Sequence, residues 1–401
     1  MKKIYYGKAV YNNKEINAVI NVLRKNSLTL IDGPNVKKLE KIVSKIFGKK
    51  YGLMVNSGSS ANLLALSSFK FKSGSEIITP NLTFSTTVAP IYQLGLVPHF
   101  IGIENNKFLA DINQIEKCIN KKTVAIMIPN LLGNIPDWYK ISKIAKKYKL
   151  KIIEDSADTI GYKINNKING KLSDVVTNSF YASHIINGAG FGGIVCFNDY
   201  KLYKKAKLLR GWGRSSATFN ESEKIKDRFN IKISGIQYDK KYIFSELGYN
   251  FLPSEISAAF ALEQLKKLNK NIKLRERNFK FLKEYFGKYS NYFKLPSQYK
   301  NVRTPWLAFP LVIKKNKKFN RNQLQIYFEE RKIQTRTIFT GNILKQPIMK
   351  NKIFSHHKNC VKVADDVMIN GILIGCHQGL KINELGYICS TFDKFVRLKK
   401  L

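Results

Sequence analysis

The chain has 401 residues, of which 44% are hydrophobic, and its formal net charge is +41. A chain of this length is able to bury a large core and usually divides it between two domains. Its longest apolar runs, such as residues 192–197, are far shorter than the roughly 20 residues that a membrane-spanning helix needs. No apolar signal core follows the N-terminal lysines. We therefore expect a cytoplasmic protein with no membrane partner.

The charge and the cysteines bear on two further classes of protein. Clustered lysine and arginine favour nucleic-acid binding, because the release of condensed counterions drives association. Here the lysines are spread almost evenly, so we expect no nucleic-acid partner, although a positive field still attracts an anionic substrate.

An odd number of cysteines without a C-x-x-C pair predicts neither a disulfide framework nor a metal site. They are Cys118, Cys196, Cys360, Cys376 and Cys389.

Short apolar runs alternate with amphipathic stretches between residues 50 and 200. This alternation is typical of strands that cross over through helices into a mostly parallel sheet, which predicts an α/β fold. The expected strands are residues 51–55, 76–79, 97–101, 123–128, 151–154, 175–180 and 192–197. The expected helices are residues 14–24, 36–47, 60–69, 111–119 and 141–148.

The second half of the chain changes character twice. Residues 211–243 are polar and lack a steady period, which predicts a long excursion over the surface or into a partner subunit. Helical patterning then runs from Ser254 to about Tyr285. A strand at 306–313 and a helix at 321–331 are typical of a small α+β domain. We expect a large domain, residues 1–260, and a C-terminal domain, residues 261–401.

Three segments place functional side chains at the ends of expected strands. VNSGSSAN, at residues 55–62, opens a helix and suits a phosphate, although a plain serine-capped helix start is the commoner explanation of it alone. Phe84 either offers a flat face to an aromatic cofactor or fills the core. The acids of IEDSAD, at residues 153–158, need a cationic partner if they are buried, and a protonated pyridine nitrogen would supply one.

A fourth segment, DVVTNSFYASHIINGAGFGG at residues 174–193, brings Ser179 and His184 into a glycine-rich loop. The order and spacing of these segments resemble the DegT/DnrJ/EryC1/StrS family of sugar aminotransferases and dehydrases across nearly the whole chain. The resemblance implies the fold of the type I pyridoxal-phosphate (PLP) transferases, which are similar to aspartate aminotransferase. It also implies a large domain around a mostly parallel sheet and a smaller C-terminal α+β domain.

The resemblance implies a role for individual residues. Asn250, in a Gly-Tyr-Asn segment, is expected to reach the cofactor phosphate of a neighbouring subunit, which implies a homodimer with active sites at the interface. Asp158 fits the dehydrase branch, because the aminotransferases usually carry glutamine there. Arg336 is expected to contact the substrate, unless it is an ordinary surface arginine. The full set of expected cofactor-binding residues is Ser57, Gly58, Ser59, Phe84, Asp155, Asp158, Ser179 and Asn250.

The sequence departs from the family at its most informative position. Most members carry a lysine that holds the cofactor covalently, whereas this chain has His184 and no lysine between Lys171 and Lys201. Imidazole forms no stable Schiff base, so the cofactor is expected to bind noncovalently as pyridoxamine phosphate (PMP). A histidine still moves protons near neutral pH, so we expect His184 to be the catalytic residue.

This substitution resembles the pyridoxamine-dependent 3-dehydrases, which remove the C3 hydroxyl of nucleotide-linked 4-keto-6-deoxyhexoses. Further segments, such as EDSAD at residue 154, RGWGR at residue 210 and IQTRTIFTGNILKQP at residue 333, most resemble the branch of CDP-4-keto-6-deoxyglucose 3-dehydrases. This resemblance implies a nucleotide diphosphate sugar as substrate and a place in deoxysugar and lipopolysaccharide O-antigen biosynthesis. Two alternatives stay open at this point. One is a sugar aminotransferase that works without the lysine, and the other is an inactive relative with a structural histidine.

The CDP-linked members bind an iron–sulfur cluster through cysteines that follow a Trp-Gly-Arg segment. In this chain Ser216 and Thr218 stand at the corresponding positions, and no cysteine lies between Cys196 and Cys360. A cluster is therefore not expected. The resemblance then implies a redox-neutral cycle in which glutamate regenerates the amine form of the cofactor.

Overall fold

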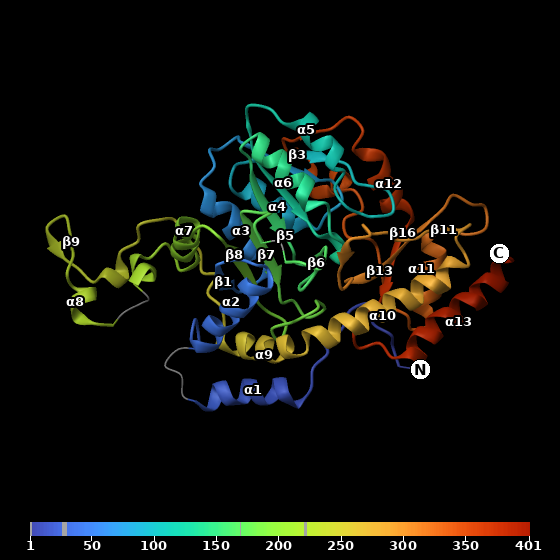
Figure 1. Ribbon diagram of the computed structural model, residues 1–401, viewed down its shortest axis with the longest axis horizontal. Helices are drawn as coiled ribbons and strands as arrows, with labels where there is room; N and C mark the ends of the chain where they lie inside the picture. Colours follow the sequence, from blue (N-terminus) through green and yellow to red (C-terminus); the bar gives the residue numbers. More distant parts are fainter. Residues whose placement is uncertain (1, 26–29, 169, 220–222) are drawn as a thin grey trace.

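A computed structural model describes the chain except for residues 1, 26–29, 169 and 220–222. Its centre is an eight-stranded sheet that is covered by helices (Figure 1). Two antiparallel pairs lie at one edge, and the remaining pairs are parallel, which confirms the mostly parallel sheet. In spatial order the strands are β1 (Tyr51–Val55), β8 (Gly193–Phe197), β7 (Val175–Ser179), β5 (Lys151–Asp155), β4 (Thr123–Pro129), β2 (Glu76–Pro80), β3 (Val97–Ile101) and β15 (Ser355–His356).

The seven expected strands of this sheet all form, with each end within one residue of its predicted position. Helix contacts leave most of their side chains buried, so these strands read as continuous apolar runs rather than as alternating patterns. The surrounding helices are α2 (Pro34–Ile46), α3 (Gly58–Phe69), α4 (Ser85–Gln93), α6 (Trp138–Lys147) and α7 (Tyr200–Arg210).

Two expected helices differ from the structure. Residues 111–119 form only a 3-10 turn and the four-residue α5 (Ile115–Cys118), because the buried Gln114 side chain accepts from Gly102 N and donates to Asp111. The long helix expected from Ser254 is two helices, α9 (Glu255–Lys266) and α10 (Leu268–Gly287). They meet at Lys267, whose backbone still has right-handed helical angles.

A second, four-stranded antiparallel sheet organises the C-terminal part, as the expected small α+β unit requires (Figure 1). Its strands, in order, are β11 (Phe293–Lys294), β13 (Ala308–Ile313), β16 (Gly371–Gly375) and β14 (Thr335–Arg336). Packed aromatic rings such as Phe286, Phe309 and Phe392 fill its core. The helices of this part are α11 (Arg321–Glu330), α12 (Val361–Asn370) and α13 (Ile382–Lys399), and the domain boundary at residue 260 stays a prediction.

The segment from residue 211 to 247, which we call the arm, extends away from the body of the molecule (Figure 1). Its described part holds α8 (Ile225–Arg228) and the short hairpin of β9 (Lys232–Ile233) and β10 (Ile236–Gln237). The expected excursion is therefore present. A further short pair joins β6 (Lys163–Ile164) to β12 (Val302–Arg303), and α1 (Asn13–Arg24) packs along α9. Among the described helices, none has the length and apolarity that crossing a membrane demands.

Candidate active site

Three strands that run in the same direction end at one edge of the large sheet. There β5 ends at Asp155 and β7 ends at Ser179, while β1 leads into Ser57 at the start of α3. The carboxyl ends of parallel strands are where open α/β sheets bind their ligands. The structure therefore brings three of the expected cofactor-binding residues to one place.

The start of α3 packs closely against the end of β7. We call this place, formed by Ser57, Gly58, Ser59 and Ser179, the cradle. Ser57 caps the helix, its hydroxyl accepting from Ser60 N at 3.1 Å. A Cβ atom added to Gly58 would lie 2.6 Å from the Cβ of Ser179, so only glycine permits this approach. Ser59 is exposed in the same turn. The first N–H groups of a helix have no intrahelical partner, and together with the helix dipole they suit a phosphate.

Asp155 is a buried carboxylate that is oriented by neutral donors. Its Oδ2 accepts from Asn62 Nδ2 and from Thr87 Oγ1, each at 2.8 Å, and its Oδ1 accepts from Ala157 N at 3.1 Å. Burial raises the pKa of Asp155, and no cation pairs with it in the described part of the chain. A carboxylate in this position is matched by a protonated pyridine nitrogen, so the residues fit a B6 cofactor.

Sequence reasoning missed the two side chains that orient Asp155. Asn62 lies one helical turn after Gly58, so its position on the cradle face of α3 was available from the spacing alone. Thr87 lies in the first turn of α4, and no local pattern separates it from an ordinary helix threonine. Both side chains are almost completely buried.

Phe84 precedes α4 and is 51% exposed, so its ring does not belong to the core. One edge meets Phe339 in a T-shaped contact with the ring centroids 6.0 Å apart. Its carbonyl accepts from Thr87 N at 3.1 Å, so the same helix start supplies Phe84 and the threonine that orients Asp155. An exposed ring here is suited to stacking on an aromatic cofactor.

Asp158 is buried near enough to Asp155 for the two carboxyl groups to interact electrostatically. Its Oδ2 accepts from Leu132 N at 2.8 Å. Burial, reinforced by the neighbouring Asp155 carboxylate, raises the pKa of Asp158 to about 7. The structure thus places a second acid near the cofactor-binding edge, and its direct contact with the cofactor stays a prediction.

His184 lies in the loop that joins β7 to β8, which we call the His184 loop, residues 180–192. Its Nδ1 lies 3.3 Å from the carbonyl oxygen of Ser179, and its ring meets Tyr181 edge-on. A carbonyl only accepts, so this contact assigns the hydrogen to Nδ1 and leaves the lone pair on Nε2. Burial, reinforced by the charge of Arg275, lowers the pKa of His184 to about 4. The imidazole is therefore neutral at physiological pH and able to accept a proton.

Arg336 is exposed beside the N-terminal segment, and its contact with the substrate stays a prediction. It lies in β14 with its guanidinium 5.9 Å from the centre of the Tyr6 ring. The next residue, Gly7, packs so closely on the His184 loop that an added Cβ would lie 2.7 Å from Ser183 Cβ. Tyr6 is a further residue of this region that sequence reasoning missed, since nothing in the local pattern marks it.

Asn250 is exposed at the base of the arm. It pairs with Gly211 across an isolated bridge, and the next residue, Phe251, accepts from Asn56 N at 3.2 Å. The segment therefore lies beside the loop that leads into the cradle. The expected reach of Asn250 into a neighbouring subunit stays a prediction.

The doubly covered, mostly parallel sheet, with a helix start, a buried aspartate and a loop at its carboxyl edge, defines the fold of the PLP-dependent aminotransferases. Comparison with known families agrees with this class. The chain belongs to the DegT/DnrJ/EryC1/StrS aminotransferase family, whose model matches residues 10–393. The resemblance inferred from the four segments is thereby confirmed.

Among curated proteins, the chain is similar to the lipopolysaccharide biosynthesis protein RfbH of Salmonella typhimurium, with 33% identity over 90% of this chain and 84% of that protein. It is also 33% identical to GDP-4-keto-6-deoxy-D-mannose 3-dehydratase of Yersinia pseudotuberculosis, over 92% of this chain and 93% of that enzyme. Each alignment covers more than four fifths of both proteins.

Two solved structures show the same fold. One is the Escherichia coli GDP-4-keto-6-deoxy-D-mannose-3-dehydratase with bound hydrated PLP, with a TM-score of 0.85, 32% identity, and coverage of 97% of this chain and 99% of that chain. The other is a GDP-4-keto-6-deoxymannose-3-dehydratase with a trapped PLP-glutamate geminal diamine, with a TM-score of 0.86, 30% identity and the same coverage.

Proposed function

We propose that this chain is a PMP/PLP-dependent 3-dehydratase of a nucleotide-linked 4-keto-6-deoxyhexose. The observation that carries the proposal is His184, a neutral imidazole in place of the family lysine, next to the Ser179 end of the cradle. Relatives at 32 to 33% identity are named 3-dehydratases, which supports the same chemistry here.

Different residues at the carboxyl edge of the large sheet contact different parts of the cofactor. Ser57, Gly58, Ser59 and Ser179 bind its phosphate, and the exposed face of Phe84 stacks on its ring. Asp155 keeps the ring nitrogen protonated, because a buried carboxylate without another cation favours a charged partner. When bound, pyridoxamine phosphate supplies an amine for the C4 ketone and a ring that accepts electrons.

His184 moves the proton at its Nε2, since Nδ1 is occupied by the Ser179 carbonyl. The neutral imidazole accepts a proton as a base and returns it as an acid when the C3 hydroxyl leaves as water. A lysine at this position would bind the cofactor covalently and favour transamination. The sugar aminotransferase alternative is therefore weaker for this chain, although aminotransferases belong to the same family.

The partners follow from the same proposal. The substrate is a nucleotide diphosphate sugar, contacted by Arg336 and attracted by the net charge of +41. Glutamate regenerates the amine form, which the relative with a trapped PLP-glutamate species supports. The protein acts as a cytoplasmic homodimer, in which the arm and Asn250 meet the second copy, and it uses no iron–sulfur cluster.

The decisive experiment measures the product. The protein is incubated with PMP and a panel of nucleotide-linked 4-keto-6-deoxysugars, with and without glutamate, and the products are weighed by mass spectrometry. A 3-deoxy sugar that is lighter than its substrate by one oxygen atom is the expected product, with PMP converted to PLP and ammonia released, and its formation over many turnovers requires glutamate. An amino sugar as the main product would establish the aminotransferase instead, and no product from any sugar would refute both.

A further inference from the structure

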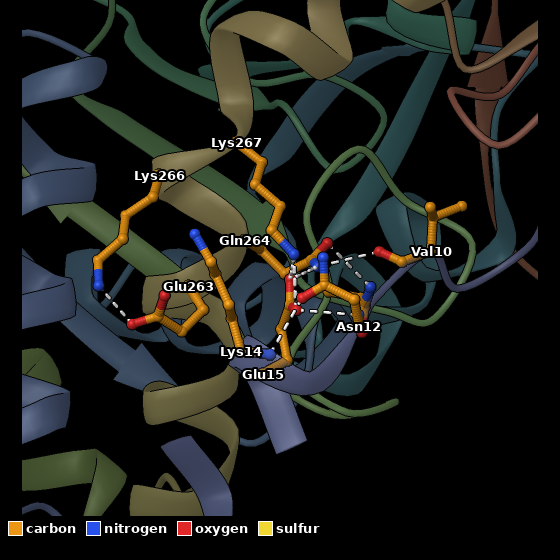
Figure 2. A network of polar contacts seen from close by, with 9 residues as sticks. Val10, Asn12, Lys14, Glu15, Glu263, Gln264, Lys266 and Lys267 are labelled. Atoms are coloured by element: carbon orange, nitrogen blue, oxygen red, sulfur yellow. Dashed lines mark hydrogen bonds and ion pairs between the residues drawn. The ribbon is translucent and has the colours of Figure 1, made fainter. Parts of the chain in front are cut away.

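A buried carboxylate joins the N-terminal helix to α9. Glu15 of α1 is fully buried, and Lys267 Nζ lies 2.5 and 2.6 Å from its two carboxylate oxygens. Gln264 Nε2 donates to the same carboxylate at 2.5 Å, as Figure 2 shows. Burial favours the neutral acid, yet the bonds from Lys267 and from Asn12 N hold the pKa of Glu15 below its usual range. The pair is therefore an ionised clamp between the two helices.

Gln264 links this clamp to the His184 loop through hydrogen bonds on both sides of its amide. Its Nε2 also donates to the carbonyl of Val10 at 3.0 Å, and its Oε1 accepts from Asn187 Nδ2 at 3.2 Å. Asn187 lies three residues after His184 and is itself buried. Gln264 thus uses both ends of its amide, one toward the N-terminal segment and one toward the loop.

Asn187 in turn shapes the loop. Its Oδ1 accepts from Ala189 N at 3.3 Å, and Ala189 has the left-handed backbone angle φ of +55°. A residue with a Cβ atom adopts this conformation at a cost, so the surrounding contacts must hold it in place. The contact from Asn187 is one of them, and it depends on the orientation that Gln264 imposes.

Ile185 and Ile186 anchor the inner side of the loop in the hydrophobic core, but close packing is incomplete on the side that faces α1. A hollow of about 480 Å³ lies between α1 and the loop, lined by Ala182, Ala189 and Gly190 on the loop side and by Ile16 and Val19 on the helix side. Where close packing is missing, a directional hydrogen bond is what defines a side-chain and backbone position.

We infer that Gln264 is a positioning residue for His184, coupling the Glu15–Lys267 clamp to the loop through Asn187. The structural half of this inference stands on the contacts alone, and its catalytic half rests on the proposed function. The side-chain hydrogen bonds of Gln264 are to Val10, Glu15 and Asn187, so it acts through the loop rather than on the cofactor or the substrate. It sets the place from which His184 works.

The test compares Gln264→Leu with a matched control on the same helix. Lys266→Met removes the exposed Lys266–Glu263 ion pair, which Figure 2 shows beside the clamp. We measure hydrogen–deuterium exchange of residues 181–192 in the protein without cofactor, and kcat and KM for water loss. Gln264→Leu is expected to speed loop exchange and to lower kcat by about 10- to 100-fold at unchanged KM. Lys266→Met is expected to change neither.

A second variant covers the case in which Gln264→Leu fails to fold. Asn187→Asp keeps the oxygen that accepts from Ala189 N but loses the donor to Gln264, and it lies in a loop rather than in a helix interface. It is expected to reproduce the faster exchange and the lower kcat. Where both single variants fold, their effects on kcat should be far from additive, because they remove one shared contact.

The outcomes separate the two proposals. Normal loop exchange together with normal kcat in either variant would overturn the positioning role. A lower kcat without a change in loop exchange would also overturn it, since the effect would then come from elsewhere. If the unaltered protein removes no water from any sugar, the proposed function fails, whereas the exchange experiment still decides whether Gln264 holds the loop.

Discussion

The edge of the large sheet that is proposed to bind the cofactor buries polar side chains, whereas the arm exposes apolar ones. At the edge, polar groups such as Asp155 and Asn62 are buried and joined by hydrogen bonds within one chain. On the arm, large apolar side chains face solvent, with Leu247 97% exposed and Ile225 78% exposed. The buried polar groups around Asp155 are oriented by contacts within one chain, whereas the arm presents an apolar surface of the kind that a second copy of the chain would cover.

The largest effect is expected from His184→Asn, because His184 is the residue that we propose moves the proton. Asparagine keeps polarity near Ser179 but has no titratable nitrogen, so kcat should fall by about 10²- to 10⁴-fold. Steady-state assay of water loss measures this. Cofactor affinity, followed by absorbance, should stay close to that of the unaltered protein. Unaffected turnover would remove His184 from the mechanism.

Asp155→Asn tests the other half of the pocket. Loss of the negative charge removes a charge-assisted bond to the ring nitrogen, so cofactor affinity should weaken by about 10- to 100-fold. Titration with PLP, monitored by absorbance, measures the change. The same substitution at Asp366, an ion-pair residue of α12, is the control and should leave affinity unchanged. Equal affinity of Asp155→Asn and the unaltered protein would contradict the pairing.

The arm is tested by Leu247→Ser. If a second copy covers Leu247, burial of this side chain stabilises the dimer by about 1.5 to 3 kcal/mol. Serine loses this contribution, so self-association should weaken by about 10- to 100-fold. Sedimentation over a range of concentrations measures the dimer dissociation constant. Ile353→Ser removes another side chain that is 78% exposed, but on the body, and should leave self-association unchanged. Equal behaviour of the two variants would place the interface elsewhere.

The smallest expected effect is a change of stability with pH. The pKa of His184 is about 4 in the folded chain, below the ordinary value of 6.5. Its contribution is therefore fully present above pH 6.5 and is lost as the pH falls toward 4. Between pH 7 and 5 the unaltered protein should lose about 1 kcal/mol more stability than His184→Asn, allowing for partial exposure of the ring. Urea unfolding at both pH values checks this, and equal losses would contradict the burial of a neutral imidazole.

The sequence pattern predicted strand positions well where neighbouring residues of a strand share the same buried environment. The strands of the large sheet appear within one residue of their predicted ends, because burial on both faces leaves a plain apolar run. The spacing of residues 55–62, 153–158 and 174–193 likewise indicated the family, since each segment follows a strand end. The helix predicted for residues 111–119 was wrong, because the buried Gln114 side chain forms hydrogen bonds to Gly102 and to Asp111.

The residue pattern was enough to predict the fold class, the family and the replacement of the usual lysine by His184. Only the tertiary structure decided which groups orient Asp155, which nitrogen of His184 keeps its lone pair and how Gln264 reaches the His184 loop. These contacts join residues that are far apart along the chain. Glu15 and Lys267 meet across more than half of the sequence, and no local period records a contact between residues so far apart.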